Sequence, residues 1–177
     1  LTTLFLSCTL FPVSQAQTCR EVVRDANGRV IQTIERQKQA SGTERAVIRD
    51  ASGRIAGTAT TQASGGGTTR TQYRDASGRT TGSAITQGSA DGFSRTTYRD
   101  ASGRTTGSAT TIPSTGSFSR TDFRDASGRS AGSKTTNGGN TGIITGTRRD
   151  ASGRMTGSST GSGKCPSGVR VPMPPCG

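Results

Sequence analysis

One hexapeptide recurs six times along this chain of 177 residues, at an unbroken spacing of 25 residues. Its pattern is Arg-Asp-Ala-Ser-Gly-Arg, with Asn in place of Ser in the first copy, and the copies begin at Arg24, Arg49, Arg74, Arg99, Arg124 and Arg149. A fixed period of this kind is typical of proteins built from one supersecondary unit, which buries its apolar side chains only against neighbouring units. The spacing therefore predicts a repeat protein rather than a conventional globular core.

Composition agrees with this prediction. Only 27% of the residues are hydrophobic and 4% are aromatic, well below the usage of ordinary globular domains. Stability then has to come from stacking of neighbouring repeats. Because the chain is also rich in Gly, Ser and Thr, partial disorder of the repeats is the alternative.

Each repeat carries the signals of a β-hairpin. In the fourth copy, Thr96-Thr97-Tyr98 and Thr105-Thr106 favour extended backbone, and Asp100-Ala101-Ser102-Gly103 lies between them. The Asp side chain can accept a hydrogen bond from the backbone two residues on, and Gly can adopt the positive φ that closes a type I turn with a bulge. We assign this turn to Asp25, Asp50, Asp75, Asp100, Asp125 and Asp150, with Gly28, Gly53, Gly78, Gly103, Gly128 and Gly153. The predicted fold is all-β: a repeat array of six 25-residue β-hairpins forming an extended antiparallel sheet or a β-solenoid.

The turn also predicts a register, in which Asp100 lies opposite Arg104, Arg99 opposite Thr105 and Tyr98 opposite Thr106. Since side chains alternate between the faces of a sheet, one face would carry an apolar column that only Arg148 interrupts: Val23, Ile48, Tyr73, Tyr98 and Phe123. The other face would carry the arginines that precede each Asp, together with Gly57, Gly82, Gly107, Gly132 and Gly157.

The two ends of the chain differ from the repeats. Residues 1–16 form an uncharged apolar run followed by small residues, which predicts the remnant of a secretory signal peptide and hence a secreted, periplasmic or cell-surface protein. Residues 17–160 hold the repeats, and residues 161–177 form a Gly- and Pro-rich tail. In an oxidising compartment we expect a disulfide between Cys165 and Cys176, which would leave Cys19 free or paired outside the chain.

The sequence gives no indication of catalysis. It contains no histidine, so a Ser-His or Cys-His nucleophile pair is excluded, and it has no phosphate-binding loop of the P-loop type. We expect no metal and no cofactor, because each turn supplies a single carboxylate with arginine on both sides.

Charge is the remaining candidate for function. The formal net charge is +12, and basic proteins favour polyanions such as anionic glycans, lipopolysaccharide or, less well here, nucleic acid. The candidate polyanion-binding residues are Arg24, Arg49, Arg74, Arg99, Arg124 and Arg149, with Arg45, Arg70, Arg95 and Arg120. We expect the arginine after each glycine to pair with the turn aspartate, and the other arginine rows to lie about 10 Å apart per hairpin. The alternative is that the charge only keeps the chain soluble.

The segment Tyr73-Arg74-Asp75-Ala76-Ser77-Gly78-Arg79-Thr80-Thr81 resembles the YD repeat of Rhs-type bacterial surface proteins. The resemblance covers the six repeats and implies β-hairpin units that coil into an extended sheet at the bacterial cell surface. Two departures are an Arg inserted between the aromatic residue and Asp, and a longer period. MORN-like repeats, also one hairpin each, share the architecture with fewer matching residues.

Two functions follow as hypotheses. The first is a secreted or surface-exposed structural or interaction protein without catalysis, which could self-associate at its sheet edges. The second is a polyanion-binding module that uses the arginine rows. The second predicts that replacing Arg74, Arg99 and Arg124 weakens binding more than replacing Arg79, Arg104 and Arg129.

Overall fold

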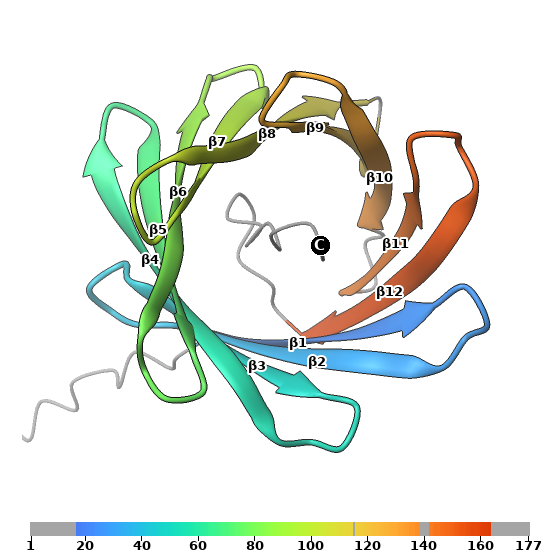
Figure 1. The fold of residues 1–177 in the computed structure, drawn as a ribbon, viewed down its shortest axis with the longest axis horizontal. Helices are drawn as coiled ribbons and strands as arrows, with labels where there is room; N and C mark the ends of the chain where they lie inside the picture. The colour runs from blue at the N-terminus through green and yellow to red at the C-terminus, as the bar shows by residue number, and fades with distance from the viewer. Residues whose placement is uncertain (1–16, 115, 139–141, 164–177) are drawn as a thin grey trace, which may run out of the picture.

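The computed structural model describes residues 17–114, 116–138 and 142–163, which form a closed antiparallel barrel (Figure 1). Every strand pairs with the strand before it and the strand after it along the chain, and β1 also pairs with β12. The strands are β1 (Gln17–Asp25), β2 (Val30–Lys38), β3 (Glu44–Asp50), β4 (Ile55–Gly65), β5 (Thr68–Asp75), β6 (Thr80–Gly88), β7 (Ser94–Asp100), β8 (Thr105–Pro113), β9 (Phe118–Asp125), β10 (Ser130–Gly138), β11 (Ile143–Arg149) and β12 (Met155–Gly163).

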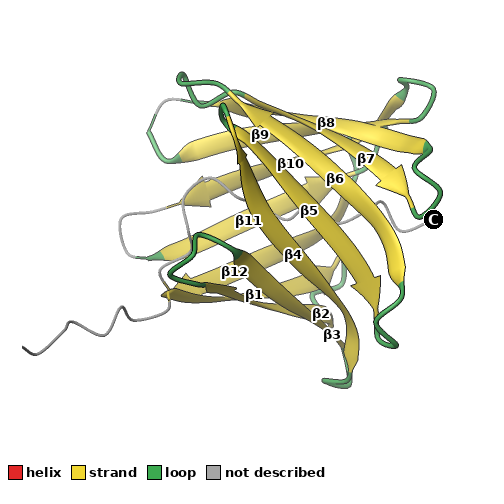
Figure 2. Cartoon of the chain, turned by 90° about the vertical axis from the view of Figure 1, so that its left-hand side faces the viewer, coloured by secondary structure: helices red, strands yellow, loops and turns green. Residues whose placement is uncertain are grey.

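The all-β prediction is confirmed, but the open sheet or solenoid is wrong. Strand β1 pairs with β12 from Cys19 opposite Gly163 to Asp25 opposite Gly157, which closes the ring (Figure 2). The physical reason is that each repeat is displaced along the strands relative to the one before, and the strands twist, so the sheet coils until its first and last strands meet. Each described strand is then paired on both sides, so the free edges that edge-to-edge self-association needs are occupied.

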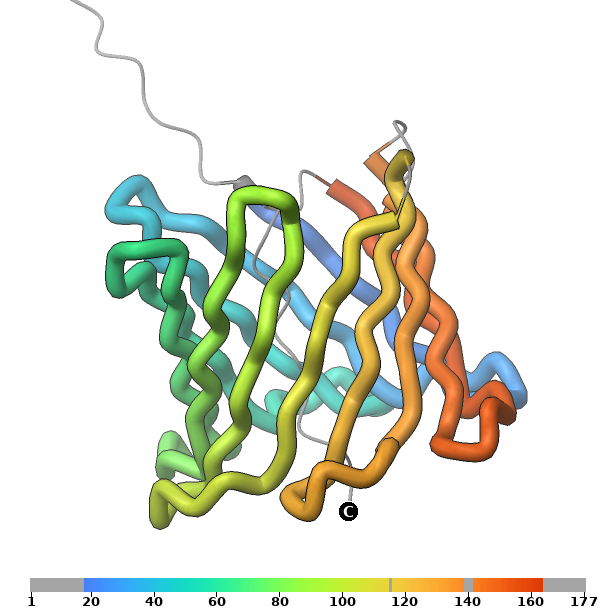
Figure 3. Tube along the Cα trace, turned by 90° about the horizontal axis from the view of Figure 1, so that it is seen from above, coloured from blue at the N-terminus to red at the C-terminus, as the bar shows by residue number. Residues whose placement is uncertain are grey.

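The repeated hexapeptides connect the strands at one end of the barrel. Figure 3 shows the turns at residues 100–103 and 125–128 at that end, and the turn at residues 89–92 at the opposite end. In the fourth copy the Gly103 N–H donates to the Asp100 carbonyl at 3.0 Å, and the Asp100 N–H donates to the Arg104 carbonyl at 2.9 Å. Gly103 has a φ of +83°, the left-handed conformation that the turn chemistry requires.

A β-bulge follows each of these turns. Arg99 lies opposite Thr105, as expected, but Tyr98 lies opposite Gly107 rather than Thr106, because Thr106 is an extra residue in the ladder. The bulge turns Gly107 toward the barrel interior, on the same face as Tyr98. Gly57, Gly82, Gly107, Gly132 and Gly157 are therefore buried on the inner face, and their expected position on the arginine face is wrong.

The interior is lined by the expected apolar column and by small residues. Val23, Tyr73 and Tyr98 are buried, and Ile48 and Phe123 pack against them. Three alanines complete the core on β4, β6 and β8. Each lies ten residues after the first arginine of the preceding hexapeptide; they are Ala59, Ala84 and Ala109. Small inward side chains leave room for a cavity between the walls.

Candidate functional site

Outward arginines follow the odd-numbered strands from β1 to β9 around the outer wall, and the sector of strands β4 to β9 holds three of these strands. Within this sector Arg70 and Arg74 on β5, Arg95 and Arg99 on β7, and Arg120 and Arg124 on β9 all point outward and are exposed. The outward residues of the intervening strands β4, β6 and β8 are uncharged. We call these six arginines the arginine wall. Asp122 is the one carboxylate among them, and it pairs with Arg120 at 2.8 Å.

The two arginines of each strand have different partners. The arginine before each turn aspartate folds back over its turn and donates from Nη1 to the carbonyl of the turn glycine, at 2.8–3.1 Å in the six copies. Arg99, for example, bonds to Gly103. Arg24, Arg49, Arg74, Arg99, Arg124 and Arg149 thus hold the turns as well as displaying charge. Arg70 and Arg95 make no ion pair with any described residue.

The turn aspartates do not pair with the arginine side chains that follow the glycines. The Oδ1 atom of Asp100 accepts hydrogen bonds from the backbone N–H groups of Ser102 and Arg104, both at 2.9 Å. Among the described residues no ion pair joins a turn aspartate to the next arginine. The expectation of such pairs is wrong, because backbone N–H groups of the turn itself donate to the carboxylate.

The spacing of the wall arginines also differs from the expectation. Arg70 lies opposite Ile85, and Ile85 lies opposite Thr97, so Arg95 is displaced by two residues along its strand. Two strand spacings across and two residues along place equivalent arginines about 12 Å apart rather than about 10 Å. The wall is therefore an inclined lattice and not a straight row.

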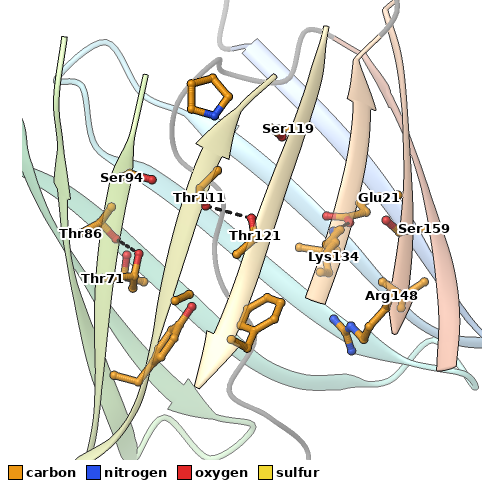
Figure 4. A pocket seen from close by; sticks show the side chains of 18 of the residues that line it. Glu21, Thr71, Thr86, Ser94, Thr111, Ser119, Thr121, Lys134, Arg148 and Ser159 are labelled. Carbon is orange, nitrogen blue, oxygen red and sulfur yellow. Dashed lines mark hydrogen bonds and ion pairs between the residues drawn. The ribbon is translucent and has the colours of Figure 1, made fainter. Parts of the chain in front are cut away.

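A second candidate site is a cavity of about 360 Å³ in the barrel lumen. Hydroxyl groups line much of it, and they pair across neighbouring strands: Thr86 with Thr96 at 2.8 Å and Thr111 with Thr121 at 2.9 Å (Figure 4). In such a pair one hydroxyl donates to the other, and the accepting hydroxyl keeps its own proton for a further partner. The wall of the cavity thus presents hydrogen-bond donors to the lumen.

Charged side chains also meet inside the barrel. Glu21 on β1 accepts hydrogen bonds from Arg36 Nη2 at 2.9 Å and from Lys134 Nζ at 3.0 Å. Burial acts to raise the pKa of Glu21, but the two cations outweigh it and lower the pKa to about 2. The neighbouring Glu44 carboxylate lies 3.7 Å from Arg36 Nη1, and burial raises its pKa against the opposing effect of Arg36.

Lys134 reaches Glu21 because two intervening strands leave room for it. A Cβ atom at Gly146 on β11 would lie 2.8 Å from Lys134 Cε and 2.7 Å from Ser159 Oγ. This inner cluster was not predicted from the sequence, although Arg148 breaks the apolar column. The further signal was that Lys134 falls one period after Ala109, and Gly146 one period after Thr121.

The structure also bears on the cysteines and on metal binding. Cys19 is buried and disulfide-bonded, so of the two alternatives expected for it, a free thiol or a thiol paired outside the chain, the free thiol is wrong. Cys165, Cys176 and the predicted signal residues 1–16 lie outside the described residues. Within the described part of the chain, no group of three or more His, Cys, Asp or Glu residues could hold a metal ion. That part also contains no helix able to span a membrane.

Comparisons with family models, with curated proteins and with solved structures give no match to this chain. The resemblance to YD and MORN-like repeats therefore stays a hypothesis, and function has to be argued from the two surfaces themselves.

Proposed function

We propose that this chain is a non-catalytic interaction protein that binds anionic polymers on its arginine wall, outside the cytoplasm. The observation that supports the proposal is the charge imbalance of strands β4 to β9, where six outward arginines face one carboxylate. Elsewhere on the wall, strands β1 to β3 carry four outward arginines, Arg20, Arg24, Arg45 and Arg49, with the Glu35 carboxylate 3.6 Å from Arg49, and strands β10 to β12 carry Arg149. A polyanion that crosses the wall would relieve repulsion between guanidinium groups and release its own counterions.

Arginine suits this role because its planar guanidinium donates two parallel hydrogen bonds to a carboxylate, sulfate or phosphate. Spacings of about 12 Å match a flexible chain with charges at regular intervals better than one compact anion. Anionic glycans and lipopolysaccharide carry such charges and occur outside the cytoplasm, where the expected signal peptide would direct the chain. Nucleic acid fits less well, since among the described residues of strands β4 to β9 the wall offers a single exposed aromatic side chain, Phe118, for base stacking.

The test compares two triple variants that remove the same charge. Arg70→Gln, Arg95→Gln and Arg120→Gln change the wall, whereas Arg29→Gln, Arg54→Gln and Arg154→Gln change exposed turn arginines. With heparin as the probe, calorimetric titration should show at least about tenfold weaker binding for the wall variant and less than about threefold for the turn variant. Affinity of the unchanged protein should fall steeply with salt, because binding releases counterions.

Equal losses in the two variants would show that net charge alone drives binding, and the arginine wall would not be a site. Absence of heparin binding at about 50 mM salt, where screening is weak, would favour the structural scaffold instead. Thermal unfolding of both variants serves as a control for folding.

A further inference from the structure

The inner wall departs from its own repeat on strands β10 and β11, as it does at Glu21, Arg36 and Glu44 on strands β1 to β3. Successive copies place alanine at 59, 84 and 109, threonine at 71, 96 and 121, and an aromatic residue at 73, 98 and 123. One period later these inward positions hold Lys134, Gly146 and Arg148. The same copy keeps the outward Arg149 and the turn residues Asp150 and Gly153, so the change is confined to the lumen.

This substitution places two cations side by side. Lys134 on β10 and Arg148 on β11 lie directly opposite each other in the ladder, and like charges in that position destabilise a sheet. Lys134 is paired with Glu21. Arg148 lines the cavity and makes no hydrogen bond or ion pair with another described residue, and Figure 4 shows it beside the cavity with Lys134 and Glu21. Among the described residues, this guanidinium group has no counterion.

The same cavity contains two buried polar groups that the described part of the chain does not satisfy. The Tyr98 hydroxyl and Ser119 Oγ are buried and line the cavity, and no described residue forms a hydrogen bond with them. A buried polar group that lacks a partner costs free energy. Burial raises the pKa of Tyr98 above its usual range, so its phenol stays neutral and can donate. The rings of Tyr98 and Phe123 add apolar surface to the same wall.

We propose that the lumen binds a small hydroxylated carboxylate of the sugar-acid class, with Arg148 holding the carboxylate. The guanidinium supplies a forked donor to one carboxylate, while Tyr98, Ser119 and the threonine pairs supply hydrogen bonds to hydroxyl groups. The aromatic rings cover the C–H groups of the ligand. The volume of about 360 Å³ lies at the small end of ligand pockets, about 300–1,000 Å³, which favours a monosaccharide over an oligomer.

The test compares a ligand that carries a carboxylate with one that lacks it, and a substitution in the lumen with a substitution on the outer surface. Glucuronate and glucose are titrated into the full chain and followed by calorimetry or NMR. We expect glucuronate to bind at least about tenfold more tightly than glucose, since a charged hydrogen bond contributes more than 1.4 kcal/mol, the equivalent of a tenfold change. Arg148→Gln should remove most of this difference. Arg154→Gln, an exposed change of equal charge in the same copy, should leave it unchanged.

Two further variants keep the result unambiguous. Arg148→Phe restores the aromatic residue found at Phe123, so it should abolish the preference for glucuronate while raising Tm by up to about 4 °C, because the opposed cations are removed. The wall variant Arg70→Gln, Arg95→Gln and Arg120→Gln should bind glucuronate normally, which separates the lumen from the outer site. The proposal is overturned if glucuronate and glucose bind alike, if neither binds, or if Arg148→Phe lowers Tm and keeps the preference.

Discussion

Replacing Glu21 by glutamine should destabilise the barrel strongly, because this carboxylate neutralises two cations inside it. Its oxygens lie 2.9 Å from Arg36 Nη2 and 3.0 Å from Lys134 Nζ, and the side chain is 16% exposed. Glutamine keeps the shape and removes the charge, leaving both cations without this counterion. Breaking a buried ion pair costs about 3–5 kcal/mol. We expect the lower value, about 3 kcal/mol, since Arg36 keeps Glu44 at 3.7 Å.

Urea unfolding at pH 7 measures this loss, with Glu35→Gln as the matched control. Glu35 pairs with Arg49 at 3.6 Å, but its side chain is 48% exposed, so its replacement should cost less than about 1 kcal/mol. Equal losses from the two variants would refute the argument that burial makes the Glu21 pair important.

The pH dependence gives an independent test of the same cluster. Because the folded pKa of Glu21, about 2, lies below its ordinary value of 4.5, its stabilising contribution is complete above pH 4.5 and is lost as the pH falls toward 2. By linkage this contribution amounts to about 3 kcal/mol. Unfolding free energies of the unchanged protein and of Glu21→Gln should therefore converge between pH 4.5 and 2. Parallel curves over that range would contradict the lowered pKa.

Two substitutions at glycines test the backbone geometry. Gly107→Ala should lower the free energy of unfolding by about 2 kcal/mol, because its Cβ would lie 2.5 Å from the Arg124 carbonyl oxygen. Gly161→Ala is the control, since no atom would lie closer than 3.7 Å to its Cβ. Similar losses from the two substitutions would contradict the close approach at Gly107. Gly103→Val should cost about 2 kcal/mol, since φ is +83° there, whereas Ala101→Val in the same turn should change Tm little. An unchanged Tm for Gly103→Val would show that the left-handed turn is not required.

The sequence predicted the elements that depend on a few adjacent residues. The Asp100 to Gly103 turn forms as its chemistry indicated, and the aromatic column from Tyr73 to Phe123 faces inward. Unbroken alternation, however, placed Gly107 on the outer face. The extra residue Thr106 reverses that assignment, and bulges of this kind depend on how strands pair rather than on local propensity.

Barrel closure and the lumen were harder to predict because both depend on residues far apart in the chain. No single repeat contains the contact between β1 and β12; it results from a displacement that accumulates over all the strands. Likewise, Glu21 and Lys134 are 113 residues apart. Lys134 is recognisable as a break in an inward column only after the bulge has shown that the column of Ala109 faces inward.

Closure of β1 against β12 fixes the number of repeats. An open solenoid can gain or lose a unit at its end, and each remaining unit keeps the same neighbours. In this ring, one repeat contributes two of the twelve strands and about 10 Å of circumference. Deleting one repeat would tighten the curvature of every remaining strand pair and bring opposite walls closer together. Duplication of the 25-residue unit could therefore generate this protein only in discrete steps of ring size, with the inner side chains having to fit each new diameter.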